Sequence, residues 1–199
     1  MGRTFANHRE RYAIERDGLR FLVDVRVAPG DHDEDRVGIV VDATRAHISF
    51  VLADGAGNSG RGRGAAELAA AMAGRDAGRD PIERLDGLDR NLARMGAEAA
   101  VVLAEVDCID GLDLVGASVG DARMWALARG EWLELTAHVP RKPLVGAGAS
   151  PTPLGILGAD ALLCASDGLV VWAGPDATTE GDDLLERLVA RAPAFRRAA

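Results

Sequence analysis

Short β-rich segments separated by tight turns dominate this sequence, and only one pair of helical segments interrupts them. Alternating apolar residues run from Tyr12 to Val27 around a turn at Asp17-Gly18, which predicts a hairpin. Further strands are predicted at 37–41 and 47–53 before the helical pair, and at 99–106, 112–119, 122–129, 131–135 and 161–165 after it. The turns between the four strands from 99 to 135 favour an antiparallel meander.

The helical pair follows the strand at 47–53. Apolar residues recur at helical spacing from Ala65 to Met72 and again from Ile82 to Met95. The segment 140–156 is rich in proline and glycine and reads as a loop, and DDLLERLVARA near the end reads as a helix. Runs of strands with paired helices predict an α+β fold, an antiparallel β-sandwich flanked by helices in αββα layers, as a single domain over residues 1–199.

The charge balance narrows the classes of partner. The formal net charge is -8, which argues against nucleic acid because phosphate binding needs clustered Lys and Arg. No stretch reaches the 18 or so apolar residues of a spanning helix, and no apolar signal segment follows the N-terminus, so we expect a protein of the cytoplasm that binds no membrane. Cys108 and Cys164 each lie in an apolar run, which favours free thiols in a reducing compartment.

Three acidic motifs stand beside predicted strand ends. They are Asp33-Glu34-Asp35 before the strand at 37–41, Asp54-Gly55 after the strand at 47–53, and Asp167-Gly168 after the strand at 161–165. Strand ends on one edge of a sandwich can converge, and carboxylates with backbone carbonyls are the ligands that Mg²⁺ and Mn²⁺ prefer. Each Asp-Gly pair alone is most often only a turn. Together the motifs suggest a two-metal hydrolytic site.

The order of these motifs resembles the PP2C (PPM) family of metal-dependent protein serine/threonine phosphatases over most of the chain. HDEDR at 32–36 resembles that family's Asn-Glu-Asp motif, with Asp33 in place of the asparagine. FVLADGAGNSGRGRGAAELAA resembles its strand, Asp-Gly-x-Gly turn and helix, and LVGASVGDARMWALARGEWLELTAH resembles its Val-Gly-Asp-Ser-Arg hairpin. ALLCASDGL resembles its strand ending in Ser-Asp-Gly-Leu. The four segments occur in the family order.

The resemblance implies a role for each matching residue. Asp54 would bridge two Mn²⁺ or Mg²⁺ ions and, with Asp167, form the catalytic centre. The Gly55 carbonyl and Glu34 or Asp35 would complete one metal site, Asp167 would serve the other, and Asp121 matches a position linked to a third ion. The implied enzyme is a phosphoprotein phosphatase, a hydrolase in which a metal-activated water attacks phosphoserine or phosphothreonine on a regulatory protein. The chain's compactness is similar to bacterial phosphatases of stress-response and sporulation partner switching.

The sequence departs from the family pattern in two places. Family members usually end with a strand bearing Asp-Asn-x-Thr, whose aspartate is a metal ligand, whereas this chain ends in Arg196-Arg197-Ala198-Ala199. Completion by Asp182 or Asp183, a weakly held ion, and a longer natural protein all stay open as explanations. The family's phosphate-binding arginine would fall near Gly30, so Arg26 is the predicted phosphate-binding residue.

Two alternatives compete with the phosphatase interpretation. A non-catalytic PP2C-like module, short of one metal ligand, would bind a regulatory phosphoprotein without hydrolysing it. The segment 55–60 also fits the dinucleotide fingerprint G-x-G-x-x-G, with Asp76 as the acidic residue. Against the second alternative, Arg61-Gly62-Arg63-Gly64 is expected to continue the loop where a helix should begin, and two helices precede the next strand.

Overall fold

The computed structural model describes residues 3–5, 8–27, 33–57, 60–76 and 78–170, and the account that follows is confined to them. Helices in this part of the chain are α1 (Arg61–Ala70), α2 (Pro81–Met95) and the short α3 (Asp167–Val170). The strands of the first half are β1 (Arg3–Phe5), β2 (His8–Arg16), β3 (Leu19–Val27), β4 (Asp35–Asp42) and β5 (His47–Ala56). Those of the second half are β6 (Glu98–Cys108), β7 (Leu112–Val119), β8 (Arg123–Ala128), β9 (Glu131–Glu134), β10 (Thr152–Ala159) and β11 (Ala161–Ala165).

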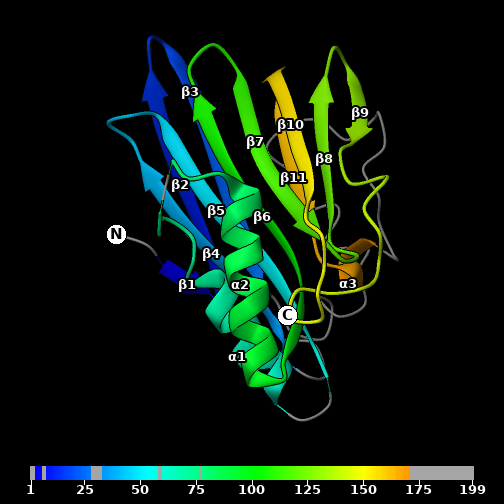
Figure 1. The fold of residues 1–199 in the computed structure, drawn as a ribbon. Coiled ribbons are helices and arrows are strands. Elements are labelled where there is room, and N and C mark those ends of the chain that lie inside the picture. Colours follow the sequence, from blue (N-terminus) through cyan, green and yellow to red (C-terminus); the bar gives the residue numbers. More distant parts are fainter. Residues whose placement is uncertain (1–2, 6–7, 28–32, 58–59, 77, 171–199) are drawn as a thin grey trace.

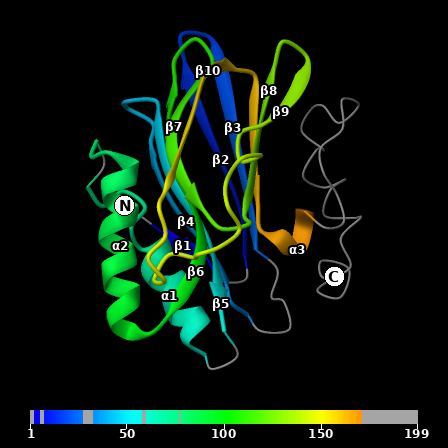
Figure 2. The ribbon, with the colours of Figure 1, turned by 45° about the vertical axis from the view of Figure 1, so that its right-hand side comes forward.

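A six-stranded antiparallel sheet, in the order β1-β4-β5-β6-β7-β10, forms the centre of the fold (Figure 1). The hairpin β2-β3 and the three-stranded sheet β11-β8-β9 pack together on one of its faces. Helices α1 and α2 cover the other face, as Figure 2 shows from the side. The expected α+β antiparallel sandwich flanked by helices is therefore confirmed. The helix predicted in DDLLERLVARA lies outside the described residues.

Side-chain alternation along the central strands builds two separate hydrophobic cores. Val51 and Ala53 of β5 pack beneath the helices, with Val101 and Leu103 of β6 beside them. The intervening residues of both strands, Ile48, Phe50, Leu52, Val102, Ala104 and Val106, face the second β-layer. The central strands β5 and β6 are therefore apolar on both faces, which explains why their sequences read as nearly continuous hydrophobic runs.

Capping residues define helix α2 clearly. The Asp80 side chain accepts a hydrogen bond of 2.7 Å from the Ile82 amide, and Pro81 occupies the first turn, where its missing N–H costs nothing. Gly96 ends the helix in a left-handed conformation, with φ of 61°. None of the helices in the described part of the chain is long and apolar enough to span a membrane.

The segment 140–156 was predicted to be a loop, and this prediction is wrong over its last five residues, because β10 begins at Thr152. β10 pairs with β7 and is an edge strand of the central sheet. A proline such as Pro153 is tolerated on an edge, where one side of the strand needs no ladder partner. Because Pro153 and Gly155 are both unfavourable in strands, the composition of this segment predicted a loop.

The predicted meander is also wrong, because it breaks after β7. β6 and β7 do form a hairpin, and so do β8 and β9, but the two hairpins belong to different sheets. The chain crosses from the central sheet to the second layer at Gly120-Asp121. Gly120 has φ of 92° and lies so close to Ala100 that a Cβ would approach the Ala100 Cα at 2.9 Å. Only glycine fits this crossing.

Candidate active site

The acidic motifs of β4 and β5 lie side by side. In the antiparallel β4–β5 ladder Asp35 is the register partner of Asp54. Opposite positions in such a ladder place their Cβ atoms about 4.5–5.5 Å apart. Sequence analysis expected Asp54-Gly55 to form a turn, but both residues belong to the end of β5, so the strand itself fixes the direction of the Asp54 side chain.

The end of β11 brings a third acidic residue to this pair. Ser166 follows β11, and its Oγ donates a hydrogen bond of 3.1 Å to Oδ2 of Asp35. Asp167 is the next residue and begins α3, whereas sequence analysis expected it in a turn. Its carboxylate contributes to raising the pKa of Asp54, so the two side chains are close enough to interact. The hydrogen bond from Ser166 therefore ties the second β-layer to the central sheet at the acidic site, at the end of the sandwich where α3 lies (Figure 1).

Asp121 is the fourth carboxylate of this group. It follows β7 at the crossing between the layers, and its charge acts on Asp54. We name Asp35, Asp54, Asp121 and Asp167 the carboxylate cluster. All four were predicted as site residues, and the structure brings them together from four different strand ends.

Burial and mutual repulsion perturb the titration of the carboxylate cluster. Burial is the largest cause that raises the pKa of Asp54, to about 8, and the negative charges of Asp35, Asp167 and Asp121 add to it. Burial also raises the pKa of Asp35, and the Asp167 charge adds to the increase, although the hydrogen bond from Ser166 and the charge of Arg36 oppose it. The cluster therefore holds more negative charge than its own surroundings neutralise, which is an arrangement suited to a cation.

Glu34 and Gly55 meet where β4, β5 and α1 approach each other. The Gly55 amide donates a hydrogen bond of 3.2 Å to the Glu34 carbonyl. The Glu34 carboxylate lies against Gly62 in the first turn of α1, because a Cβ on Gly62 would be 2.6 Å from Glu34 Oε1. Of the two predicted acidic ligands of this motif, Asp35 is the one whose charge acts on Asp54.

Arg36 organises the acidic loop, and sequence analysis missed it. Its side chain is only 3% exposed and forms ion pairs with Asp33, at 3.2 Å, and with Glu67 of α1, at 3.2 Å. Its Nη1 also donates to the carbonyls of Asp33, at 3.0 Å, and Asp35, at 2.8 Å. An arginine directly after three acidic residues was the available signal, since a buried guanidinium fork suits such a loop.

Arg26, the predicted phosphate-binding residue, lies in β3. Its Nε is 3.8 Å from Asp24 Oδ1, and its side chain is 14% exposed. Arg26 lines the same large cavity as Asp35 and Ser166. The structure does not bring it into direct contact with the cluster among the described contacts, and its role stays a prediction.

The donor set of the cluster fits hard divalent cations. Carboxylate and carbonyl oxygens are the ligands that Mg²⁺ and Mn²⁺ take, and the negative charges of Asp35, Asp167 and Asp121 add to the burial that raises the pKa of Asp54. Among the described residues, however, no three His, Cys, Asp or Glu side chains already stand as a preassembled metal site.

The dinucleotide alternative does not survive the topology. One argument used against it is wrong, because α1 begins at Arg61, directly after the glycine-rich segment. The decisive observation is that β5 and β6 pair antiparallel. A dinucleotide-binding βαβ unit needs parallel strands, so the segment 55–60 is not that fingerprint.

No protein-family model matches this sequence, and no curated protein matches it either. Solved structures do match. A bacterial serine phosphatase has 17% identity and a TM-score of 0.63 over 96% of this chain and 92% of that chain. The serine/threonine phosphatase Stp1 from Staphylococcus aureus has 18% identity and a TM-score of 0.62 over 96% of this chain and 89% of that chain. A protein solved in work on the bacterial stressosome has 20% identity and a TM-score of 0.62 over 80% of this chain and 85% of that chain.

These similarities agree with the order of the acidic motifs along the sequence and with their convergence at one end of the sandwich. At such identities they concern the fold. The chain thus has the α+β sandwich fold of the bacterial PP2C-type serine/threonine phosphatases, as its sequence resemblance to that family implied.

Proposed function

We propose that this chain is a metal-dependent protein serine/threonine phosphatase acting on phosphoserine or phosphothreonine of a regulatory protein. The observation that carries the proposal is the convergence of Asp35, Asp54, Asp121 and Asp167 at one end of a PP2C-type sandwich. Burial, to which the negative charges of Asp35, Asp167 and Asp121 add, raises the pKa of Asp54 to about 8, and this supports the proposal because a bound cation would offset both effects.

The residues of the site would divide the work as follows. Asp54 would bridge two ions. Asp35 and the Gly55 carbonyl, together with Glu34, would hold one of these ions. Asp167 would hold the other. Asp121 would serve a third, weaker ion. When bound, Mn²⁺ or Mg²⁺ would supply Lewis acidity and positive charge at the phosphoryl group. The chain itself would orient these carboxylates through β4, β5 and Ser166.

Arg26 is proposed to bind the substrate phosphate. A guanidinium offers a planar fork of donors that matches two phosphate oxygens. The position of Arg26 on the cavity that also reaches Asp35 supports this role. Its ion pair with Asp24 would then compete with phosphate.

A regulatory phosphoprotein is the proposed partner. The support is the structural similarity to a protein solved in work on the bacterial stressosome, a modular system that has been adapted to control secondary messenger signaling. A role in stress-response signalling follows from this similarity as part of the proposal. No residue of the site identifies the phosphoprotein by its sequence.

One observation favours the second candidate, a non-catalytic binding module. No three metal-ligating side chains in the described part of the chain are preassembled, so a phosphoprotein could bind at this end of the sandwich without being hydrolysed. The two candidates differ in turnover and agree in phosphoprotein binding.

Hydrolysis assays separate the candidates. We expect the chain to hydrolyse p-nitrophenyl phosphate and a phosphothreonine peptide with Mn²⁺ or Mg²⁺, to lose this activity in EDTA, and to lose it in Asp54→Asn. The matched control is Asp110→Asn, in the exposed β6–β7 turn, which should keep full activity. Folded protein that turns over neither substrate with either metal would refute the phosphatase and leave the binding module.

A further inference from the structure

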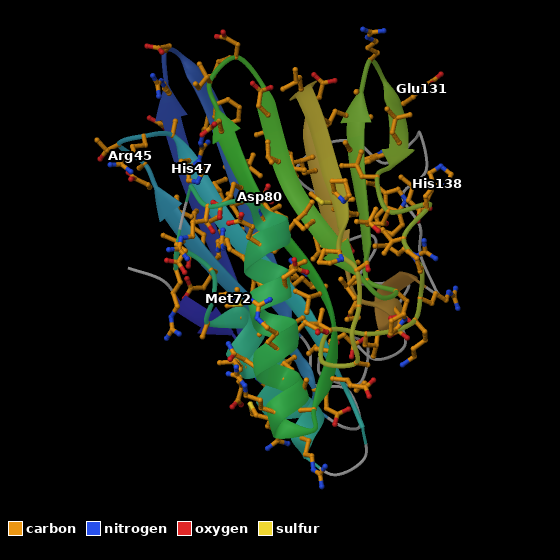
Figure 3. All side chains as sticks on the ribbon, in the orientation of Figure 1. Arg45, His47, Met72, Asp80, Glu131 and His138 are labelled. Carbon is orange, nitrogen blue, oxygen red and sulfur yellow. The ribbon has the colours of Figure 1, made fainter. Side chains whose placement is uncertain are left out.

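The segment between β9 and β10 carries positive charge and no acidic residue. No Asp or Glu occurs at positions 135–159, although the whole chain has 31 acidic residues and a net charge of -8. Arg141 and Lys142 are adjacent in this stretch, and His138 precedes them and adds positive charge when it is protonated. We name residues 137–143 the basic loop. Figure 3 shows His138 on this loop, just beyond the end of β9.

The cations of the basic loop are exposed and have no carboxylate partner in the described part of the chain. His138, Arg141 and Lys142 are all exposed. Among the contacts of the described residues, none of the three forms an ion pair or a side-chain hydrogen bond. Arg36 and Arg123, by contrast, are both held by carboxylates. The charge of the basic loop is therefore free to act on a ligand.

The start of the basic loop is anchored near Asp121. Thr136, the residue before the loop, is fully buried, and its Oγ1 accepts a hydrogen bond of 3.0 Å from the Met124 amide. Its carbonyl accepts a hydrogen bond of 3.4 Å from Nη1 of Arg123. Arg123 begins β8 two residues after Asp121 and is the register partner of Ala165, the last residue of β11. The loop therefore leaves the second layer at the end of the sandwich where α3 lies (Figure 1).

The end of the basic loop is anchored at the same end of the central sheet. Leu144 follows the loop and is 4% exposed, and its Cδ2 would lie 2.9 Å from a Cβ on Gly120, at the crossing between the layers. Val145 exchanges two backbone hydrogen bonds with Ala99, of 3.0 and 3.1 Å. Ala99 is in turn the register partner of Gly55. Both ends of the loop thus lie next to backbone that belongs to the proposed metal site.

Helix α2 fixes the residues that follow the basic loop. Oδ1 of Asp89 accepts hydrogen bonds from the backbone amides of Gly146, Gly148 and Ala149, at 2.7, 3.1 and 3.3 Å. A small hollow of about 170 Å³ lies between the loop and Val119, at the end of β7. A loop held at both ends presents its charges in a constant place, so less ordering entropy opposes the binding of a ligand.

We propose that the basic loop binds acidic residues that flank the phosphorylated residue of the substrate protein. This inference rests on the proposed phosphatase function and assigns it a substrate class: phosphoproteins with Asp or Glu close to the phosphoserine or phosphothreonine. An extended segment advances about 3.3 Å per residue, so acidic residues two to four positions from the phosphorylated residue lie about 7–13 Å from it. Because the ends of the loop are held beside Asp121 and Gly55, these flanking positions are the ones that its cations would meet.

Charge complementarity favours this class of substrate. A chain with a net charge of -8 repels acidic segments over much of its surface, so a cationic loop beside the proposed site decides where such a segment docks. Arg141 and Lys142 would attract Glu or Asp at the flanking positions and repel Lys or Arg there. The basic loop would thus act on the choice of substrate and leave the phosphoryl chemistry to the carboxylate cluster.

Peptide kinetics test the basic loop. Three phosphothreonine peptides are identical except that the positions two to four residues to either side carry Glu, Gln or Lys. In Mn²⁺ we expect the full chain to prefer the Glu peptide over the Lys peptide about tenfold in kcat/KM, and salt should reduce this preference. The double variant Arg141→Gln/Lys142→Gln should lower the preference about three- to tenfold, through KM and not kcat, because the loop does not touch the reacting atoms.

The matched control is Arg75→Gln/Arg129→Gln, which also removes two positive charges. Both arginines are exposed, and both lie far from the carboxylate cluster. Arg129 follows the far end of β8, and Arg75 follows Gly74, whose amide donates to Ser49 near the start of β5. This variant should keep the peptide preference of the natural chain.

Each remaining outcome decides the proposal. Equal kcat/KM for the Glu and Lys peptides, or an unchanged preference in the loop variant, would overturn it. A preference lost equally in the control variant would assign the effect to net charge and would overturn it too. Absence of turnover of p-nitrophenyl phosphate and of every peptide would refute the phosphatase instead. Fluorescence anisotropy of the labelled peptides on the folded chain would then decide: the loop variant must weaken binding of the Glu peptide about three- to tenfold, and unchanged binding would refute the loop's role.

Discussion

Asp35 and Asp54 are direct register partners in the β4–β5 ladder. Like charges in opposite positions of a sheet are destabilising, and here burial makes the repulsion stronger. The sheet nevertheless holds both carboxylates where β4 begins and β5 ends, with Asp167 beside them. The metal-free fold is therefore expected to be locally destabilised by this repulsion, which a bound cation would relieve.

Removal of one charge from this pair should stabilise the metal-free protein. The pKa of Asp54 is raised from 3.8 to about 8, so the folded state binds more protons than the unfolded state between these values. Stability then falls as the pH rises through this window, and Asp54→Asn should abolish the loss. In EDTA we expect the variant to gain about 1–3 kcal/mol over wild type at pH 8 and much less at pH 5, by denaturant unfolding.

The same variant should lose its response to metal. Wild type should gain thermal stability in Mn²⁺ or Mg²⁺, because an ion that binds only the folded state stabilises it. Asp110→Asn, at an exposed turn, should behave as wild type in both experiments. If Asp54→Asn were less stable than wild type in EDTA at pH 8, the repulsion within the cluster would not be the dominant local effect.

Gly55 should tolerate no side chain. A Cβ on Gly55 would overlap the backbone of Gly62, so β5 and α1 approach each other too closely for any other residue. Gly55→Ala should lower the free energy of unfolding by about 3 kcal/mol or more, and should weaken metal binding because Glu34 and Asp54 flank this contact. Calorimetry of Mn²⁺ binding and urea unfolding measure the two effects.

A matched glycine provides the control for this experiment. Gly64 lies in α1, the helix that Gly55 approaches, and no other part of the structure lies within 4 Å of the Cβ that alanine would add. Gly64→Ala should raise stability by about 0.5–1 kcal/mol, because alanine is favoured over glycine inside helices. If Gly55→Ala lowered stability no more than Gly64→Ala does, the close approach of β5 and α1 would not be what excludes a side chain at Gly55.

Arg36 should position the acidic loop through its fork of donors. Arg36→Lys keeps the positive charge but cannot reach Asp33, Glu67 and two carbonyls at once. In Arg36→Lys we expect calorimetry to show about a tenfold loss of Mn²⁺ affinity. The loss should be larger in Arg36→Met. Glu67→Gln, which removes only the partner on α1, should change affinity less, and unchanged affinity in all three variants would limit Arg36 to a structural role.

The members of the carboxylate cluster were predictable from the order of their motifs and the resemblance to the PP2C family, although each Asp-Gly pair alone is most often only a turn. Each stands next to a strand end, and the antiparallel sandwich places those ends at one edge. Arg36 escaped notice because its importance comes from burial against α1, which no local pattern reveals. β10 escaped for a related reason, since Pro153 and Gly155 oppose strand propensity and only pairing with β7 fixes the strand.

The split of the second β-layer could not be predicted either. The hairpin β2-β3 was evident from the turn at Asp17-Gly18, and β8 and β9 from theirs. Which strands pair across the layer depends on long-range contacts, and β7 and β8 look like neighbours in a meander until Gly120 redirects the chain. Local pattern thus specified the elements, and tertiary packing decided their partners.

His47 should make stability depend on pH at the end of β5 remote from the carboxylate cluster (Figure 3). Its Nδ1 lies 2.7 Å from Asp107 and its Nε2 lies 2.8 Å from Glu105, so both ring nitrogens face carboxylates and both must carry protons to donate. Burial lowers the pKa of His47, but these two hydrogen bonds and charges together raise it above the ordinary value of 6.5.

A raised pKa in the folded state fixes the sign of the effect. The stabilisation by His47 is fully present below pH 6.5 and is lost as the pH rises through the folded pKa. Glu105 also accepts from Arg84 and Ser49, so it stays paired when His47 is neutral, and the loss should be partial. Urea unfolding of His47→Gln should remove this slope, whereas His138→Gln, at an exposed site, should keep it; an unchanged slope in His47→Gln would assign the pH dependence to another group.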